Sequence, residues 1–217
     1  IYTLAVARRY QGKTREALST LDELLEITPD YGRAWQERGH ALLAAGQPDQ
    51  ALVSFEQAVH LNSALPASWS QLANLYQQMG KRERYRAARA ELVQLQALPR
   101  EVVSVTSMIN EGRFFRAERL CRKFLQAHPH HVEAMRLLAI IGSELGVLSD
   151  AEFLLESCLE FAPNNLRVQY DYANLLLKMQ KFEKAREETA RLVAGEPDNL
   201  RYLALHANAL AGVGEHE

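Results

Sequence analysis

The sequence predicts an all-α fold, a right-handed superhelical solenoid of antiparallel helix pairs. Three residue types support this prediction, because each returns at steps of 32 to 34 residues or a multiple of that distance. A period near 34 residues is the combined length of a helix, a turn, a second helix and a second turn. The recurring positions are Gly12, Gly46, Gly80, Gly112, Gly146 and Gly214, with Gln180 at the missing station, then Ala17, Ala51, Ala117, Ala151 and Ala185, and finally Pro29, Pro129, Pro163 and Pro197.

Residues 32–65 show how one such unit would pack. Gly46 permits the left-handed backbone that ends a first helix, and a proline near the end of other units stops the second helix. Small residues on both helices would let the two backbones approach closely while large residues fill the space around them. The facing positions are Trp35, Gly39 and Leu42 on the first helix and Ala51, Phe55 and Ala58 on the second.

Composition indicates a globular protein outside the membrane. The 217 residues are 47% hydrophobic with a formal net charge of -2, and no apolar stretch approaches the roughly 20 residues that span a bilayer. Cys121 and Cys158 stand far apart in the interiors of predicted helices, which favours a reducing compartment, and we expect a cytoplasmic protein. Because the chain begins at Ile1 and stops at Glu217 inside repeats, we also expect it to be a fragment.

No catalytic constellation, metal site or cofactor site is recognisable in the sequence. His128, His130 and His131 flank Pro129 without an accompanying cysteine or carboxylate at ligand spacing, so a polar turn is favoured over a metal site. The two cysteines have no nearby histidine that would activate a thiolate, so we expect buried structural thiols. We predict no catalytic residue and no cofactor.

Two basic clusters raise nucleic acid as a partner. Against this partner, residues 1–98 are nearly neutral, the remaining residues are acidic, and second helices face the convex side of such an array. We therefore expect solvated or interdomain surfaces and no nucleic acid. The clusters are Lys81, Arg82, Arg84, Arg86 and Arg89, and then Arg113, Arg116, Arg119, Arg122 and Lys123.

The spacing of tryptophan, three residues, glycine, and then alanine and proline at fixed offsets resembles the tetratricopeptide repeat family over the whole chain. In this register, units start near residues 1, 32, 66, 98, 132, 166 and 200. The resemblance implies repeats one to three in residues 1–97. It implies repeats four to six, with the first helix of a truncated seventh, in residues 98–217.

The join between these two blocks departs from the family pattern. Tyr85 replaces the small residue and Arg89 the large aromatic residue of the third repeat, so its second helix cannot pack in the usual way. Val105 stands where the fourth repeat should have glycine or alanine. Residues 96–100, which contain Pro99, would form a connection with a kink or an altered superhelical pitch.

The resemblance also implies that first helices line a concave groove. Amide side chains at equivalent stations can hold an extended peptide by its backbone. Arg167 and Arg201 oppose the dipoles of their helices, which favours an acidic ligand. The alternative is that the asparagines stabilise neighbouring repeats and the arginines only aid solubility. The candidate peptide-binding residues are Asn74, Gln77, Arg136, Arg167, Tyr170, Asn174, Arg201 and Asn208, and Arg33, Gln36 and His40 hold groove positions of the second unit.

Family members that clamp chaperone tails have lysine at the fifth groove position, and this chain has other residues there, so chaperone-tail binding is not expected. Residues 98–142 and 197–217 are similar to the repeat region of bacterial tetratricopeptide-repeat sulfotransferases. This similarity implies an acceptor-recruiting role, and the alternative is a pure assembly scaffold without an attached enzyme. The apolar stripe of Leu203, Ala207 and Leu210 would lack a covering helix, which predicts fragment-specific self-association.

Overall fold

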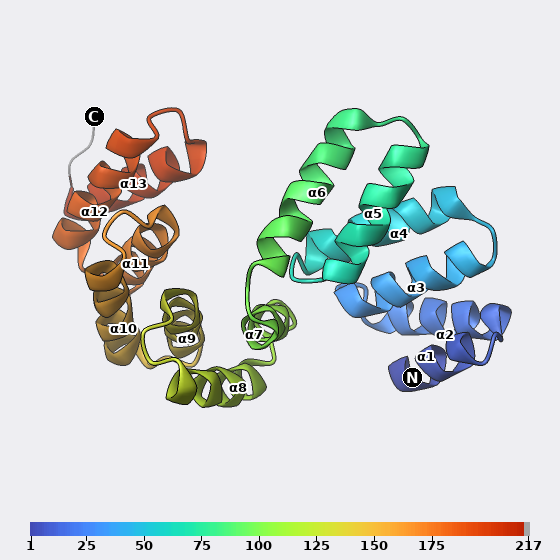
Figure 1. Cartoon of the computed structure of the whole chain (residues 1–217). Coiled ribbons are helices and arrows are strands. Elements are labelled where there is room, and N and C mark those ends of the chain that lie inside the picture. The colour runs from blue at the N-terminus through green and yellow to red at the C-terminus, as the bar shows by residue number, and fades with distance from the viewer. Residues whose placement is uncertain (215–217) are drawn as a thin grey trace. The chain divides into compact units, whose positions relative to one another are not determined.

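The computed structural model describes residues 1–214, which form thirteen α-helices and no strand (Figure 1). The chain divides into two compact units, residues 1–113 and residues 114–217. The predicted fold class is confirmed: the chain is an all-α array of antiparallel helix pairs. The predicted starts at residues 32, 66, 132, 166 and 200 coincide with the first residues of five helices, and the start near residue 98 precedes a helix that begins at Arg100.

In the first unit, each helix from α1 to α5 packs against the next one in the chain. The seventh helix does not pack along the sixth, and it contacts the start of α3 and the turn after α4 instead. Only Ala97, Leu98 and Pro99 connect these two helices. The helices are α1 (Tyr2–Tyr10), α2 (Thr14–Ile27), α3 (Gly32–Ala44), α4 (Pro48–Leu61), α5 (Pro66–Gln78), α6 (Arg82–Gln96) and α7 (Arg100–Asn110).

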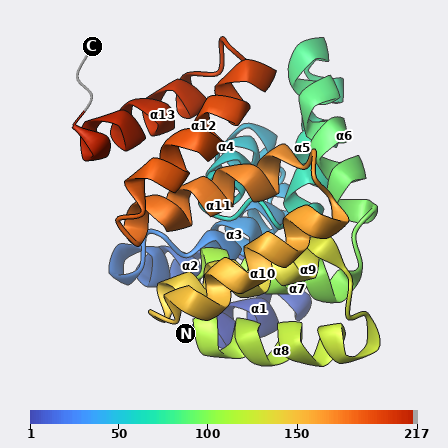
Figure 2. The same cartoon turned by 90° about the vertical axis from the view of Figure 1, so that its left-hand side faces the viewer.

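In the second unit, the helices follow one another in chain order from α8 to α13 in both views (Figure 1 and Figure 2). Besides packing on its partner, α11 also contacts α9 and α13, so the first helices of successive pairs form one layer. The helices are α8 (Phe114–Ala127), α9 (Val132–Glu144), α10 (Leu148–Phe161), α11 (Leu166–Lys178), α12 (Phe182–Gly195) and α13 (Leu200–Val213).

The small residues allow the close helix contacts that the sequence predicts. A Cβ atom added at Gly39 would lie 2.7 Å from the ring of Phe55, which is fully buried. Gly212 in α13 likewise has no room for a Cβ beside the ring of Phe182. Both glycines therefore allow the two helices of a pair to approach closely.

The recurring glycines adopt left-handed backbone conformations where first helices end. Gly46 has a φ of 73° and Gly146 a φ of 82°. Gln180, at the station where glycine is missing, has a φ of 57° and is the one non-glycine residue with a positive φ among residues 1–214. The repeat geometry therefore imposes this conformation on a residue that does not favour it.

Replacing Gln180 with glycine should raise the free energy of unfolding of the second unit by about 0.5 to 1 kcal/mol, because glycine adopts the left-handed region without the steric cost that an L side chain incurs. Urea unfolding followed by circular dichroism would measure the gain. Glycine at Lys178, within α11, should lower stability by about as much. A loss of stability at both positions would contradict the assigned role of the left-handed turn at Gln180.

In the third repeat, α6 packs along α5, and the predicted irregularity of this repeat stays a prediction. Ala88 and Leu92 are the buried residues of α6, Tyr85 is half-buried and Arg89 is exposed. Val105, in α7, is buried. The two compact units divide after Arg113, so α7 belongs to the first unit. The predicted boundary between repeat blocks at residues 97 and 98 stays a prediction.

The predicted apolar stripe of α13 is open in the structure. Leu203 is 40% exposed and Ala207 is exposed, while Leu205 and Ala209 provide the buried face of the helix. Residues 215–217, with the predicted fragment end at Glu217, lie outside the described residues. Self-association through this stripe stays a prediction.

Within residues 1–214, no helix has both the length and the apolar character needed to cross a membrane.

Candidate peptide-binding site

The main candidate site is a cavity of about 350 Å³ on the layer of first helices in the second unit. Its walls come from three successive first helices, α9, α11 and α13, and from the residue that precedes α13. Four of the predicted residues meet here, one from α9, two from α11 and one from α13. The lining residues are Arg136, Arg167, Tyr170, Asp171, Asn199, Arg201 and Tyr202.

Arg136 is held in place by two carboxylates. Its Nε lies 2.9 Å from Oε2 of Glu133, its Nη2 lies 2.7 Å from Oε1 of the same residue, and Nη1 donates to Oδ2 of Asp171. Its side chain is only 12% exposed. Burial disfavours the charge, yet hydrogen bonds and charges from Glu133 and Asp171 outweigh burial and raise the pKa of Arg136. Arg136 thus serves mainly to bridge α9 and α11.

Asp171 is the acidic group of the cavity. Burial raises the pKa of Asp171 above its ordinary value of 3.8, although the neighbouring Arg136 opposes that shift. The ion pair between Oδ2 of Asp171 and Arg136 offsets the negative charge of this carboxylate within the protein. Asp171 therefore offers little repulsion to an incoming anion.

Arg167 and Arg201 are the exposed cations of the cavity. Each is the second residue of its helix and stands two positions after an asparagine whose side chain caps that helix. Oδ1 of Asn165 accepts from the backbone N–H of Arg167 at 3.1 Å, and Oδ1 of Asn199 accepts from that of Arg201 at 3.1 Å. The equivalent caps fix the backbones of the two arginines at equivalent points one repeat apart.

Two tyrosines form an aromatic wall beside the arginines. The rings of Tyr170 and Tyr202 are 5.9 Å apart and inclined by 40°. Both rings are half-buried against a small core cluster that contains Leu192 and Leu205. Tyrosines in this position offer apolar contact area with little loss of side-chain entropy on binding.

The remaining predicted residues lie outside this cavity. Asn174 lines a neighbouring cavity of about 340 Å³, and its amide donates to the backbone oxygen of Tyr170 at 2.9 Å. Asn208 is exposed on α13. In the first unit, Asn74 and Gln77 are exposed and line a separate hollow of about 450 Å³.

Asp171, Asn199 and Tyr202 line the cavity but were not among the predicted residues. Asn199 could have been found from its place directly before an apolar helix, a helix-capping signal that Asn165 repeats one unit earlier. Asp171 and Tyr202 gave no such signal, because they lie at helix positions that the family pattern does not assign to the groove.

The histidines and cysteines have structural roles in the second unit. His131 accepts from the backbone N–H of Ala134 and caps α9, and His128 packs on the ring of Phe124. Both thiols are buried and free, as expected, and burial raises the pKa of Cys121 and of Cys158 to about 12. Such thiols are poor nucleophiles at neutral pH.

The basic clusters are partly neutralised at the surface. Arg84 pairs with Glu56 at 3.1 Å and Arg86 with Glu83 at 3.2 Å in the first unit. In the second unit, Arg122 pairs with Glu118 at 2.8 Å within α8. The pairs agree with the expected solvated surfaces.

Two profiles of the tetratricopeptide repeat family match the chain, one over residues 2–66 and the other over residues 144–209, together more than half of its length. The chain belongs to the tetratricopeptide repeat family. The TPR repeat-containing protein MJ0941 of Methanocaldococcus jannaschii is 32% identical over 71 residues, or 33% of this chain. The match spans 21% of the length of that relative.

Solved tetratricopeptide repeat structures are among those similar to this chain, at low sequence identity. YrrB, a TPR protein with an unusual peptide-binding site, is 14% identical, with a TM-score of 0.45 over 85% of this chain and 96% of that one. A tetratricopeptide repeat protein from Parabacteroides merdae is also 14% identical, with a TM-score of 0.49 over 96% of this chain and 82% of that one. Similarity at this level carries no information about ligands.

Proposed function

We propose that the second unit of this tetratricopeptide repeat protein is a non-catalytic interaction module that binds an extended acidic peptide across α9, α11 and α13. The observation that carries the proposal is the cavity in which Arg167 and Arg201 stand one repeat apart beside two tyrosines. Equivalent stations on successive helices suit an extended chain, which presents similar groups at regular intervals.

The charge of the cavity supports an acidic ligand. Arg167 and Arg201 are exposed on the cavity wall, and their positive charges attract an acidic chain. Each exposed charge contributes modestly, about 0.2 to 1 kcal/mol, and the contribution decreases as salt screens it. We therefore expect a moderate, salt-dependent affinity.

Apolar contact supplies the second component of binding. A side chain between two acidic residues of the peptide would pack on the rings of Tyr170 and Tyr202, which line the same cavity as the arginines. Asn174 and Asn208 lie along the same helices and would hold the peptide backbone at either side. The role of the asparagines rests on their register in the sequence.

The double substitution Arg167→Glu and Arg201→Glu should weaken binding of a fluorescent glutamate-rich peptide at least about tenfold, because it converts two attractions into two repulsions. Fluorescence anisotropy at low and physiological salt would measure the change. The double substitution Arg116→Glu and Arg119→Glu in α8 is the matched control, since both residues are exposed in the same unit and neither lines the cavity. Equal losses from both variants would contradict the proposed site.

The role of this module in a longer protein is a further part of the proposal. The similarity of residues 98–142 to the repeats of bacterial sulfotransferases suggests recruitment of an acceptor protein to an attached transferase domain. The alternative, an assembly scaffold, is equally compatible with peptide binding. Sequencing the gene beyond Glu217 separates them: a strand followed by a basic, glycine-containing phosphate loop supports the transferase, and continued repeats support the scaffold. The buried free thiols suit the cytoplasm.

A further inference from the structure

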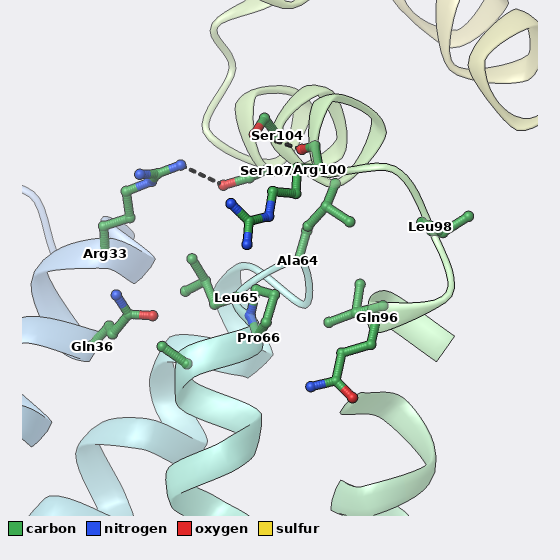
Figure 3. A pocket seen from close by; sticks show the side chains of 13 residues that line it. Arg33, Gln36, Ala64, Leu65, Pro66, Gln96, Leu98, Arg100, Ser104 and Ser107 are labelled. Atoms are coloured by element: carbon green, nitrogen blue, oxygen red, sulfur yellow. Dashed lines mark hydrogen bonds between the residues drawn. The ribbon is translucent and has the colours of Figure 1, made fainter. Parts of the chain in front are cut away.

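A second cavity, of about 560 Å³, lies within the first unit where α7 faces the start of α5 (Figure 3). It is distinct from the proposed peptide site, which lies in the other unit. Arg33 and Gln36 of α3 line one side and Arg100 and Ser104 of α7 line another. This volume is within the range of pockets that hold small molecules.

The charged residues that line the cavity favour an anionic ligand. Its lining contains two arginines and no carboxylate. Arg33 is already committed, because its Nε lies 2.6 Å from Oε1 of Glu111 and its Nη2 lies 3.0 Å from Oγ of Ser107. Arg100 is the other cation, and no carboxylate among residues 1–214 pairs with its guanidinium. An unpaired cation that borders a cavity favours a negatively charged ligand group there.

The rest of the cavity is largely apolar. Leu65 and Pro66 come from the turn into α5, Leu95 and Leu98 from the end of α6 and the connection, and Val103 from α7. Several of its polar groups already have partners within the protein: Oε1 of Gln36 accepts from Ser68, and Oγ of Ser104 donates to the backbone oxygen of Arg100. One uncommitted charge beside an apolar wall matches a ligand with one acidic group and an apolar body.

We infer that this cavity is a binding site for a small amphiphilic carboxylic acid. The carboxylate would lie against the Arg100 guanidinium, in the two-pronged geometry that arginine offers to carboxylates. The apolar body would lie along Leu65, Leu95 and Val103. The ligand would therefore contact α7 and the third repeat together, at the point where α6 and α7 do not pack along each other.

Because the ligand would contact α7, amide exchange in this helix should change when the ligand binds. The helix is held to the first unit by polar contacts of its C-terminal half, to Arg33 and Asn62. A ligand at Arg100 and Val103 would add contacts to the N-terminal half of the helix. Because ligands that bind only the folded state stabilise it, backbone amides of residues 100–107 should exchange more slowly when the site is filled.

Octanoate is a suitable probe, with octanol and octylamine as matched compounds that lack the negative charge. We expect calorimetry to detect saturable binding of octanoate and at least about tenfold weaker binding of the other two, the loss expected without a charge-assisted hydrogen bond. Octanoate should also slow amide exchange in α7.

Arg100→Gln should weaken octanoate binding at least about tenfold and abolish the slower exchange of α7. Arg89→Gln is the matched control, since Arg89 is exposed in α6 of the same unit and does not line the cavity. The inference is overturned if octanoate and octanol bind equally, if Arg100→Gln binds octanoate as the original protein does, or if only an acidic peptide binds at this cavity. Each result is independent of peptide binding by the second unit.

Discussion

Replacing Arg136 with methionine should lower the free energy of unfolding of the second unit by about 3 to 5 kcal/mol at neutral pH, because it leaves two partly buried carboxylates without their cation. Glu133 and Asp171 are 18% and 21% exposed and both hydrogen-bond to this one guanidinium. Methionine matches the apolar part of the arginine side chain, so the loss reports the charge. Urea unfolding followed by circular dichroism would measure it.

The loss should become smaller as the pH falls. The folded-state pKa of Asp171 is already raised above 3.8, and removal of Arg136 raises it further. A carboxyl group whose pKa is raised by folding stabilises the protein below its unfolded pKa, and that stability is lost as the pH rises through the folded pKa. The deficit of the variant should therefore be smallest near pH 4 and full at pH 7.

Two comparisons separate this effect from general damage. Asp171→Asn combined with Arg136→Met should recover part of the stability at pH 7, because it removes one of the stranded charges. Arg119→Met, at an exposed position of α8, should change stability by less than about 0.5 kcal/mol. A deficit of Arg136→Met that is independent of pH would contradict the assigned role.

Replacing Asn62 with alanine should lower the free energy of unfolding of the first unit by about 2 to 3 kcal/mol, because it leaves buried polar groups of α7 without partners. Asn62 is 1% exposed, and its Nδ2 lies 2.9 Å from Oγ of Ser107 and 3.3 Å from Oε1 of Glu111. Its Oδ1 accepts from Nδ2 of Asn110 at 3.1 Å and from the backbone N–H of Ala64 at 3.1 Å.

The buried carboxylate of Glu111 increases the expected cost of removing the Asn62 amide. The side chain is 4% exposed, and its Oε2 accepts no hydrogen bond, although it lies 3.2 Å from Nε of Arg113. Hydrogen exchange should show faster opening of residues 104–110 in Asn62→Ala, and urea unfolding should show the loss of stability. Asn74→Ala, an exposed asparagine of α5, should affect neither. Similar results from both variants would show that α7 is held by apolar packing instead.

Much of the fold could be predicted because the same pattern of small, large and turn residues recurs in successive repeats. The positive φ of Gln180 illustrates this point: the register alone placed a glutamine in a conformation that its side chain disfavours. The steric contact of Gly39 with Phe55 likewise followed from the alternation of small and large residues. The docking of α7 could not be predicted, since it depends on hydrogen bonds from Asn62 and Arg33, which lie 45 or more residues away in the sequence.

The candidate site was predicted in part. The groove register named Arg136, Arg167, Tyr170 and Arg201 among its candidates, and the structure places these four in one cavity together with three residues that the register did not name. The register could not show that Arg136 is committed to Glu133 and Asp171, because that depends on side-chain geometry between neighbouring helices. Nor could it show that the Asn174 amide donates to the backbone of its own helix.

The central claim, that the first helices of the second unit hold an acidic peptide, is tested most directly by mapping where such a peptide binds. Titration of the isotopically labelled protein with a glutamate-rich peptide, followed by backbone amide NMR, would locate the contact residue by residue. We expect the largest shift changes in the first turns of α11 and α13, around Arg167 and Arg201, and we expect them to weaken as salt is added. Shift changes confined to α10 and α12, or to the first unit, would contradict it.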